Sequence, residues 1–259
     1  MDINKEYDEV KKLLEDQKNE SQAISMARYM KNKFLFYGIP ASKRKEVYKG
    51  ILKREKNQKR INWELLDKCY QDEYREMQYF VCDYLRMMQK YIGFEDISNI
   101  QKYIQTKSWW DSVDCFNQIL GNMALKDKRV KEIMLLRAED EDMWLRRVAL
   151  NHQLGKKEKT DSVLLEKILV KNLNSSEFFI NKAIGWSLRD YSKTNPAWVR
   201  DFLARYDDGL ANLSKKEASK YIWLHVLWKE RKIAFSSKVR YNSDRKESEF
   251  GIYEKSYPK

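Results

Sequence analysis

The scarcity of residues that interrupt regular structure constrains this chain most. Only 8 glycines and 3 prolines occur in 259 residues. Glycine and proline are the residues that most strongly interrupt helices and strands, so the interiors of its elements are rarely broken. Good helix formers, namely Leu, Lys, Glu, Arg, Gln and Met, recur along the whole length. The sequence therefore predicts an all-α protein.

The predicted helices come in pairs. Apolar residues recur at the helical period in segments of about 10 to 17 residues, separated by short polar connections. Pairs of segments recur roughly every 35 to 45 residues, which resembles the spacing of HEAT-type repeats. Tryptophans at positions 63, 110, 144, 186 and 223 fall 47, 34, 42 and 37 residues apart. We expect a HEAT-like solenoid, in which each helix pair buries its apolar face against its neighbours.

The character of the chain changes near its C-terminal end. Residues 233–259 are rich in Ser and Lys, with Tyr interspersed, and show no helical period. We therefore divide the chain into a repeat domain over residues 1–232 and a basic tail over residues 233–259. The tail is expected to be flexible or loosely docked, with an additional DNA contact as the alternative.

The charge balance points to a polyanionic partner. Lys and Arg number 51 against 39 acidic residues, which gives a net charge of +12 and a pI of about 9.3. Nucleic acid is the first expectation, an anionic membrane surface the second, and a basic protein without such a partner the third. Mean hydropathy is −0.78, and no apolar run approaches the ~20 residues of a membrane span. The charged N-terminal segment does not resemble a signal peptide. We expect a monomer in the cytoplasm, associated with the nucleoid when bound to DNA.

Metal-binding and nucleotide-binding patterns are absent from the sequence. The cysteines, Cys69, Cys82 and Cys115, are scattered, and the histidines are His152 and His225. A structural zinc site needs about four clustered ligands, and no glycine-rich phosphate loop occurs. The sequence predicts no metal, no nucleotide or other cofactor, and no disulfide framework.

Three helices carry polar or aromatic residues away from their predicted core stripe. In the helix over residues 178–191, Trp186 falls off the apolar face, beside Lys182, Arg189 and Lys193. A large aromatic residue among three cations needs an explanation beyond the core.

The helix over residues 109–125 presents Trp110 and Asp114 together, because side chains at i and i+4 are neighbours. Asn117 and Gly121 project to the same side, where a glycine permits close approach of a ligand or another backbone. In the helix over residues 144–154, Arg147 and Asn151 lie off the stripe, and His152 is interpreted as a core-edge histidine.

Two interpretations fit these positions. In a solenoid both faces of a helix can be buried, so each residue could simply contact the next repeat. The second interpretation, which we favour because three helices share the pattern, is a common site. Periodicity gives the faces, but it does not show that the helices converge.

Several segments resemble the AlkD family of DNA alkylation repair glycosylases. They are KSWWDSVD at 107–114, EFFINKAIGWSLRDYSKTNPAWVRDF at 177–202, MWLRRVALNHQLGKKEKTD at 143–161, YMKNKFLFYGIP at 29–40 and LSKKEASKYI from 213. The similarity covers most of the chain to about residue 228, and the tail lies outside it.

The resemblance implies stacked HEAT-like helix pairs that form a concave, basic groove for duplex DNA containing alkylated purines. It implies a catalytic cluster of Trp110, Asp114 and Trp186. It assigns Arg147 and Arg189 to the DNA backbone near the lesion, and it makes Tyr29 a further cleft residue. Groove lysines would neutralise phosphates; the candidates are Lys156, Lys157, Lys159, Lys182 and Lys193.

The expected reaction is hydrolysis of the N-glycosidic bond of purines alkylated at N3 or N7, without a base-flipping pocket. A carboxylate such as that of Asp114 would stabilise the oxocarbenium-like sugar, and indole faces would pack on the deoxyribose. The first alternative is a non-catalytic HEAT-like nucleic-acid scaffold. The second is a protein-interaction repeat whose basic face binds an acidic partner.

Overall fold

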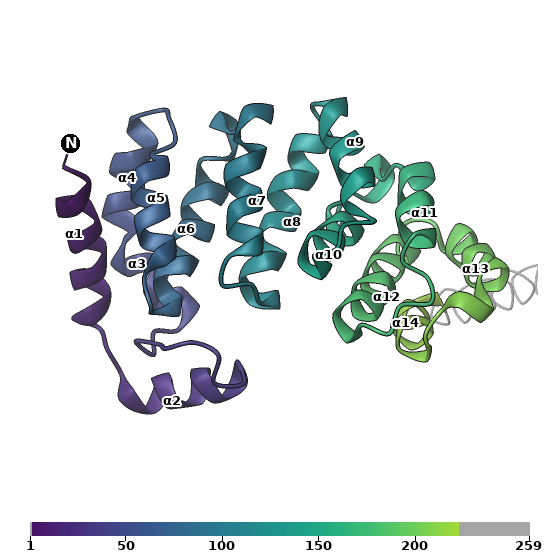
Figure 1. Ribbon diagram of the computed structural model, residues 1–259, viewed down its shortest axis with the longest axis horizontal. Helices are drawn as coiled ribbons and strands as arrows, with labels where there is room; N and C mark the ends of the chain where they lie inside the picture. The colour runs from purple at the N-terminus through teal and green to yellow at the C-terminus, as the bar shows by residue number, and fades with distance from the viewer. Residues whose placement is uncertain (1, 223–259) are drawn as a thin grey trace, which may run out of the picture.

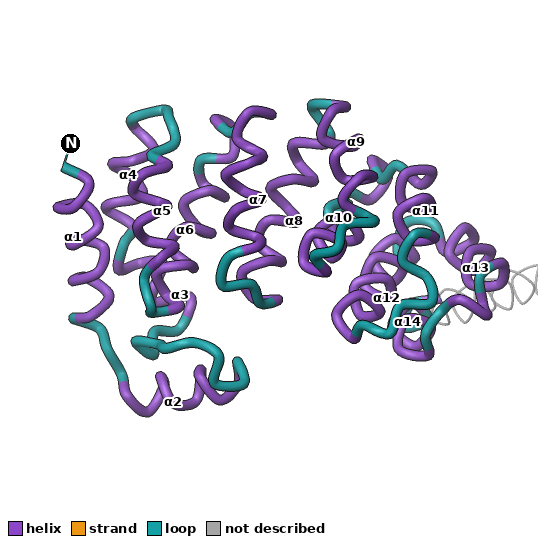
Figure 2. Tube along the Cα trace, viewed as in Figure 1, coloured by secondary structure: helices purple, strands orange, loops and turns teal. Residues whose placement is uncertain are grey.

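The computed structural model describes residues 2–222, and within this range it is built from helices. Figure 2 shows helices joined by loops, and the only β-type pairing in the described residues is a bridge between Leu35 and Tyr74. The all-α prediction is confirmed. The α-helices are α1 (Ile3–Glu15), α2 (Glu20–Tyr29), α3 (Ala41–Val47), α4 (Lys49–Asn57), α5 (Trp63–Gln71), α6 (Arg75–Met87), α7 (Ile97–Gln105), α8 (Trp110–Ala124), α9 (Lys128–Arg137), α10 (Met143–Asn151), α11 (Ser162–Val170), α12 (Phe178–Ser192), α13 (Pro196–Arg205) and α14 (Asn212–Ala218).

From α5 onward the helices form two rows (Figure 1). In the first row α6, α8, α10, α12 and α14 pack in succession, each on the next. The second row contains α5, α7, α9, α11 and α13, and each of these packs on at least one helix of the first row. The buried apolar residues form one continuous cluster from Val10 to Ile222. This is a helical-repeat fold, in which each helix pair is stabilised by its neighbours.

The repeat is shorter than the 35 to 45 residues predicted. First-row helices begin at residues 75, 110, 143, 178 and 212, and second-row helices at 63, 97, 128, 162 and 196, so successive starts lie 31 to 35 residues apart. The predicted helices were too long as well, because the observed α-helices contain 7 to 15 residues. The tryptophans do not mark the repeat, because Trp63 belongs to the second row, and Trp110, Trp144 and Trp186 occupy different positions within their first-row helices.

Local sequence explains where several helices begin. The carboxylate of Asp142 accepts a hydrogen bond from Trp144 N at the start of α10, and Asp161 caps α11 in the same way through Leu164 N. Asn195 caps α13, and Pro196 occupies its first turn. Asp and Asn are preferred caps because their side chains bind the otherwise unpaired first N–H groups of a helix.

Polar contacts join consecutive first-row helices. Arg75 of α6 pairs with Asp111 of α8, and Asp114 of α8 pairs with Arg147 of α10. The same relation continues along the row, between side chains 33 to 36 residues apart: Asn151 with Ser187 and Lys182 with Glu217. Off-stripe polar residues therefore serve, at least in part, as inter-repeat contacts, which was the first of the two interpretations of the sequence.

Helix α2 stands apart from the two rows, at the lower left of Figure 1, and none of its residues is buried. After α2 the chain reverses through Lys31 and Asn32, which both have positive φ angles. The loop that follows is fixed by the buried carboxylate of Glu76, which accepts hydrogen bonds from the backbone N–H groups of residues 37–39. This anchor fixes the segment that follows α2 to the start of α6.

Two sequence-based expectations concern the C-terminal end of the chain. The boundary at residue 232 and the tail over residues 233–259 both lie outside the described residues. Within residues 2–222, no helix combines the length and apolar character that crossing a membrane would require.

Candidate active site

A cleft of about 470 Å³ lies where the end of α2 meets α8, α10 and α12. The structure thus brings together residues whose convergence the sequence left open. Seven of the predicted site residues line it, namely Tyr29, Trp110, Asp114, Arg147, Lys182, Trp186 and Arg189. Two further aromatic residues, Phe178 and Phe179, complete the lining.

The carboxylate of Asp114 is held in a fixed orientation. Arg147 donates two hydrogen bonds to it, from Nε to Oδ1 and from Nη2 to Oδ2, both at 2.9 Å. Asn117 donates a third bond, to Oδ1, at 3.3 Å. Each carboxylate oxygen can accept about two hydrogen bonds. Since Oδ2 receives a bond only from Arg147 among the described residues, it is the oxygen with an acceptor site left for a water or a sugar.

Asp114 is largely shielded from solvent, with 16% of its side chain exposed. Burial raises the pKa of Asp114, and the bonds from Arg147 and Asn117 oppose that rise without cancelling it. Burial acts in this direction because removing a carboxylate from water disfavours its charged form. Arg147 itself is buried, with 4% of its side chain exposed, and it also donates to the carbonyl oxygen of Phe179.

Arg147 was predicted to contact the DNA backbone, and its placement supports a different primary role. Its Nε, Nη1 and Nη2 atoms already donate to protein oxygens. It therefore fixes Asp114 and the start of α12. The projection of Arg147 and Asn151 away from the core stripe was correct, but both residues are buried because that face of α10 packs between α8 and α12.

Aromatic rings form the walls beside this ion pair. Tyr29, 69% exposed, meets Trp110 edge-on with ring centroids 5.9 Å apart. The ring of Trp186 lies 5.9 Å from the guanidinium carbon of Arg147. Trp110 and Trp186 are both half-buried, so their rings support the cleft and remain open to it. The cleft therefore offers aromatic surface next to a largely shielded carboxylate.

Two cations of the cleft share one carboxylate that the sequence reasoning missed. Lys182 Nζ lies 2.6 Å from Glu217 Oε1, and Arg189 Nη1 lies 2.5 Å from Glu217 Oε2. Glu217 belongs to α14, one repeat beyond. Its position 35 residues after Lys182 matches the repeat length, which is the signal that could have found it.

Four of the five predicted DNA-binding lysines do not line this cleft, namely Lys156, Lys157, Lys159 and Lys193. Lys156 is not among the cleft residues, and its ammonium group donates to Asn122. Lys193 pairs with Asp190 at 3.4 Å and lies over the ring of Tyr221. The cleft does not include either lysine, so any contribution of theirs to DNA binding would come from outside it.

Sequence reasoning also missed Phe178, whose side chain is 60% exposed at the start of α12. The next residue, Phe179, is partly buried and packs on Trp109 at the cleft. The two consecutive phenylalanines, one outside the core stripe, were the available signal.

The face of α8 that was predicted to lie away from the core is open to the cleft only at Trp110 and Asp114. Asn117 is buried, and Gly121 lies against α10, where an added Cβ would be 1.7 Å from the carbonyl oxygen of His152. Gly121 thus permits approach of a backbone. His152 is 1% exposed, and burial lowers its pKa to about 4, so its ring is neutral at pH 7. The interpretation of His152 as a core-edge residue is confirmed.

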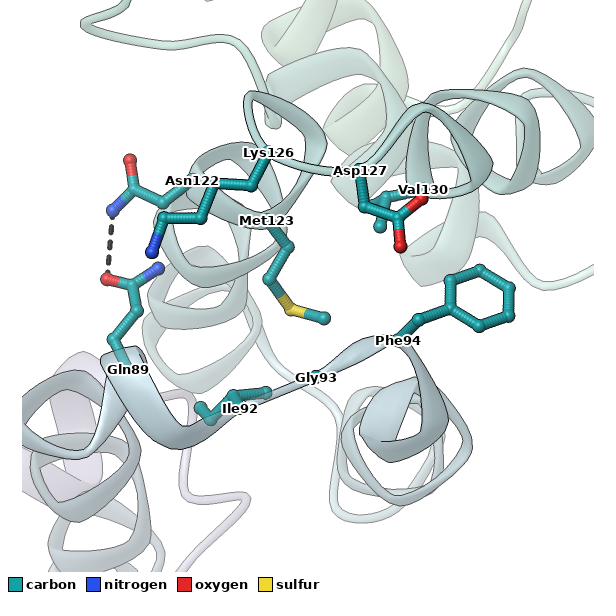
Figure 3. Close-up of a pocket in the computed structure, with 9 residues that line it drawn as sticks. All are labelled: Gln89, Ile92, Gly93, Phe94, Asn122, Met123, Lys126, Asp127 and Val130. Atoms are coloured by element: carbon teal, nitrogen blue, oxygen red, sulfur yellow. Dashed lines mark hydrogen bonds between the residues drawn. The ribbon is translucent and has the colours of Figure 1, made fainter. Parts of the chain in front are cut away.

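A second hollow, of about 260 Å³, lies where the α6–α7 and α8–α9 connections meet (Figure 3). Met123 points into it, and Gln89 accepts a hydrogen bond from Asn122 at its rim. Its one lining carboxylate, Asp127, is already paired with Arg129 at 2.6 Å. This hollow does not offer the combination of indoles, a buried carboxylate and several cations that the α8–α12 cleft has. No group of three or more potential metal-ligating side chains occurs within residues 2–222.

Comparison with known proteins gives the family. A family model described as DNA alkylation repair enzyme matches residues 10–222. The chain belongs to this family. A solved structure described as a predicted DNA alkylation repair enzyme from Enterococcus faecalis is 38% identical, with a TM-score of 0.73. The match covers 79% of this chain and 96% of that one. A search of curated proteins found no significant match.

The family match covers every helix that lines the cleft and nearly all of the described repeats. Membership in the family indicates a role in DNA repair. The reaction and its substrates have to be inferred from the residues of the cleft.

Proposed function

We propose that this member of the DNA alkylation repair family is a DNA glycosylase that releases cationic N3- or N7-alkylated purines from duplex DNA. The observation on which the proposal rests is the convergence of Trp110, Asp114 and Trp186 in one cleft. A largely shielded, oriented carboxylate between aromatic walls suits a reaction in which positive charge develops on a sugar.

The proposed step is hydrolysis at the anomeric carbon. The bond between that carbon and the purine nitrogen breaks, and its electron pair leaves with the base. Water supplies a hydroxyl group to the carbon and releases a proton to Asp114 or to solvent. Asp114 Oδ2, which has an acceptor site left, is placed to stabilise the cationic sugar and to orient this water. Arg147 keeps the carboxylate from rotating, so little reorganisation accompanies the reaction.

The leaving group explains why one carboxylate suffices. A purine alkylated at N3 or N7 carries a positive charge and departs as a neutral base, so the enzyme does not have to protonate it. The indole rings of Trp110 and Trp186 would pack on the deoxyribose and present π-faces to the developing cation. The product is an apurinic site, so the reaction would be the first step of base excision repair.

The cations of the cleft suit the sugar–phosphate backbone. Lys182 and Arg189 line the same cleft as Asp114, and such side chains bind phosphates through charge-assisted hydrogen bonds. Recognition from the backbone side would need no pocket for a flipped base. The stacked helix pairs would then form a HEAT-like groove, with this cleft as the point where the lesion sits.

Replacement of Asp114 tests the proposal. We expect Asp114→Asn to lower the rate of 7-methylguanine release from methylated duplex DNA by at least about 100-fold, as for loss of a transition-state charge. Affinity for the duplex should change little. Asp201→Asn is the matched control, because Asp201 is an exposed carboxylate on α13 that pairs with Arg205. Released bases are measured by mass spectrometry.

The results separate the candidate functions. Full activity of Asp114→Asn would overturn the assigned mechanism. Wild-type protein that binds duplex DNA without releasing any alkylated base would instead favour a non-catalytic nucleic-acid scaffold. Equal binding of heparin and duplex DNA over a salt titration would favour a basic surface for acidic protein partners.

A further inference from the structure

Glu217 is a buried carboxylate that lies behind the cleft. Its side chain is 6% exposed, and three cations surround it: Lys182, Arg189 and Lys220. Burial alone would raise the pKa of Glu217, but hydrogen bonds from Lys182 and Lys220, with the charges of Lys182 and Arg189, lower it to about 2. The group is therefore ionised at any pH at which the protein would bind DNA.

A close helix contact brings Glu217 to this place. Gly185 of α12 faces α14, and an added Cβ there would lie 2.6 Å from Glu217 Cβ and 3.0 Å from Ser214 Cα. Lys182 and Arg189 flank Gly185 on the same face of α12, because residues three and four apart are neighbours on a helix. Ser214 fixes the contact by donating a hydrogen bond to the carbonyl oxygen of Asn181.

The shared carboxylate leaves both cleft cations with unused donors. Lys182 gives one N–H to Oε1, and Arg189 gives one to Oε2. An ammonium group has three N–H donors and a guanidinium has five. Two cations held side by side on one carboxylate thus retain positive charge and free N–H groups, and both residues line the cleft. That arrangement is suited to the oxygens of a phosphodiester.

We infer that Glu217 is a positioning residue, which holds Lys182 and Arg189 as a paired clamp for one phosphodiester of the bound DNA. This inference rests on the proposed function and adds a role for the last described helix, α14. Glu217 itself does not contact DNA. Its negative charge would oppose DNA binding if it acted only through the overall field of the protein.

Glu217 can act through long-range charge or by positioning the two cations, and these two roles predict opposite changes in DNA affinity when its charge is removed. Removing a negative charge near a polyanion tightens binding if long-range electrostatics dominates. Removing the tether weakens binding if positioning dominates, because two long side chains then have to be ordered when DNA binds.

The experiment measures binding of a short fluorescein-labelled undamaged duplex by fluorescence anisotropy. We expect Glu217→Gln to weaken binding by about threefold or more. Glu139→Gln is the matched control, because Glu139 pairs with Lys171 away from the cleft. It removes the same charge and should leave binding unchanged or slightly tighter. Glu217→Asp keeps the charge but shortens the tether, and it should weaken binding as well.

A double variant excludes a general loss of structure. In a protein that already has Lys182→Gln and Arg189→Gln, the change Glu217→Gln should have no further effect on binding, whereas a general loss of structure would still weaken it. Equal or tighter binding by Glu217→Gln in the otherwise unchanged protein would overturn the inference, as would a full additional loss in the double-variant background. Because the duplex is undamaged, these results do not depend on glycosylase activity. Failure of the wild type to release alkylated bases would count against the proposed function alone.

Discussion

Two aspartates three residues apart on α8 have different surroundings. Asp111 is bound by Arg75 through two hydrogen bonds of 2.9 and 2.7 Å and by Tyr79, and it joins α6 to α8. Asp114 is bound by Arg147 and borders the cleft. The pattern WWDSVD contains both, and helical projection does not separate them, because residues three apart are neighbours on a helix. Only the side chains that face them show that Asp111 is taken up by contacts between helices, whereas Asp114 borders the cleft.

The surroundings of Asp114 predict a pH dependence. The proposed reaction needs the ionised carboxylate, so activity is present above the pKa of Asp114 and is lost as pH falls through it. Burial raises this pKa and Arg147 opposes the rise. We expect Arg147→Met to move the acid limb of the base-release profile to higher pH by about 1 unit or more. Single-turnover base release across a pH series measures the shift.

The control for this profile is Arg205→Met, which removes an exposed cation on α13 that pairs with Glu166 and Asp201 and does not line the cleft. It should leave the acid limb in place. If Arg147→Met and wild type share the same acid limb, ionisation of Asp114 does not set it.

At the scale of elements, glycines determine how closely first-row helices pack. Gly121 lies where α8 meets the end of α10, and Gly185 lies where α12 meets α14. In both cases the added Cβ would strike backbone or a Cβ of the neighbouring helix, which has no rotamer to relieve the clash. Close packing at these points sets the spacing between the helices that line the cleft.

Gly121→Ala is therefore expected to destabilise the protein. The added Cβ would lie 1.7 Å from His152 O, so α8 and α10 have to separate, at a cost of about 1–3 kcal/mol in the free energy of unfolding. Gly50→Ala is the control, because Gly50 lies in α4 with nothing within 4 Å of the added Cβ. That change should stabilise the protein by about 0.5–1 kcal/mol. Urea unfolding measures both, and equal stability of the two variants would contradict the packing argument.

At the scale of the whole molecule, the cleft is assembled from parts distant in sequence. Tyr29 comes from α2, and the remaining lining residues come from three consecutive helices of the first row. In Figure 1 the α2 segment lies below the rows, and the anchor provided by Glu76 returns the chain to α3. A net charge of +12 favours association with polyanions, and we propose this cleft as the place where DNA binds.

The salt dependence of DNA binding follows from this charge. The logarithm of the affinity for duplex DNA should fall linearly with the logarithm of salt concentration, with a slope of about −0.9 per phosphate neutralised. Lys182→Gln should reduce the magnitude of the slope by about 0.9. Lys171→Gln, at the end of second-row helix α11, should not change it. An unchanged slope for Lys182→Gln would remove Lys182 from the phosphate contacts.

The sequence by itself determined the fold class and the faces of individual helices. Helix formation and periodicity are local properties, so the all-α fold, the core stripe of α12 and the pairing of Trp110 with Asp114 on one face could be read from residues a few positions apart. The resemblance of WWDSVD and KAIGWSLRDYSKTNP to a known family then suggested a reaction for those faces. The predicted repeat length was too long, because apolar periodicity locates helices better than it locates their ends.

Only the tertiary structure decided which faces meet. The bonds from Arg147 to Asp114 and from Lys182 and Arg189 to Glu217 join residues 28 to 35 positions apart. Such contacts depend on how far each repeat advances and on where glycines let backbones approach, and neither is encoded within one helix. For this reason the sequence identified seven of the nine residues that line the cleft. Packing between repeats determined that Arg147 is buried, that Lys156 and Lys193 lie outside the cleft, and that Glu217 pairs with Lys182 and Arg189.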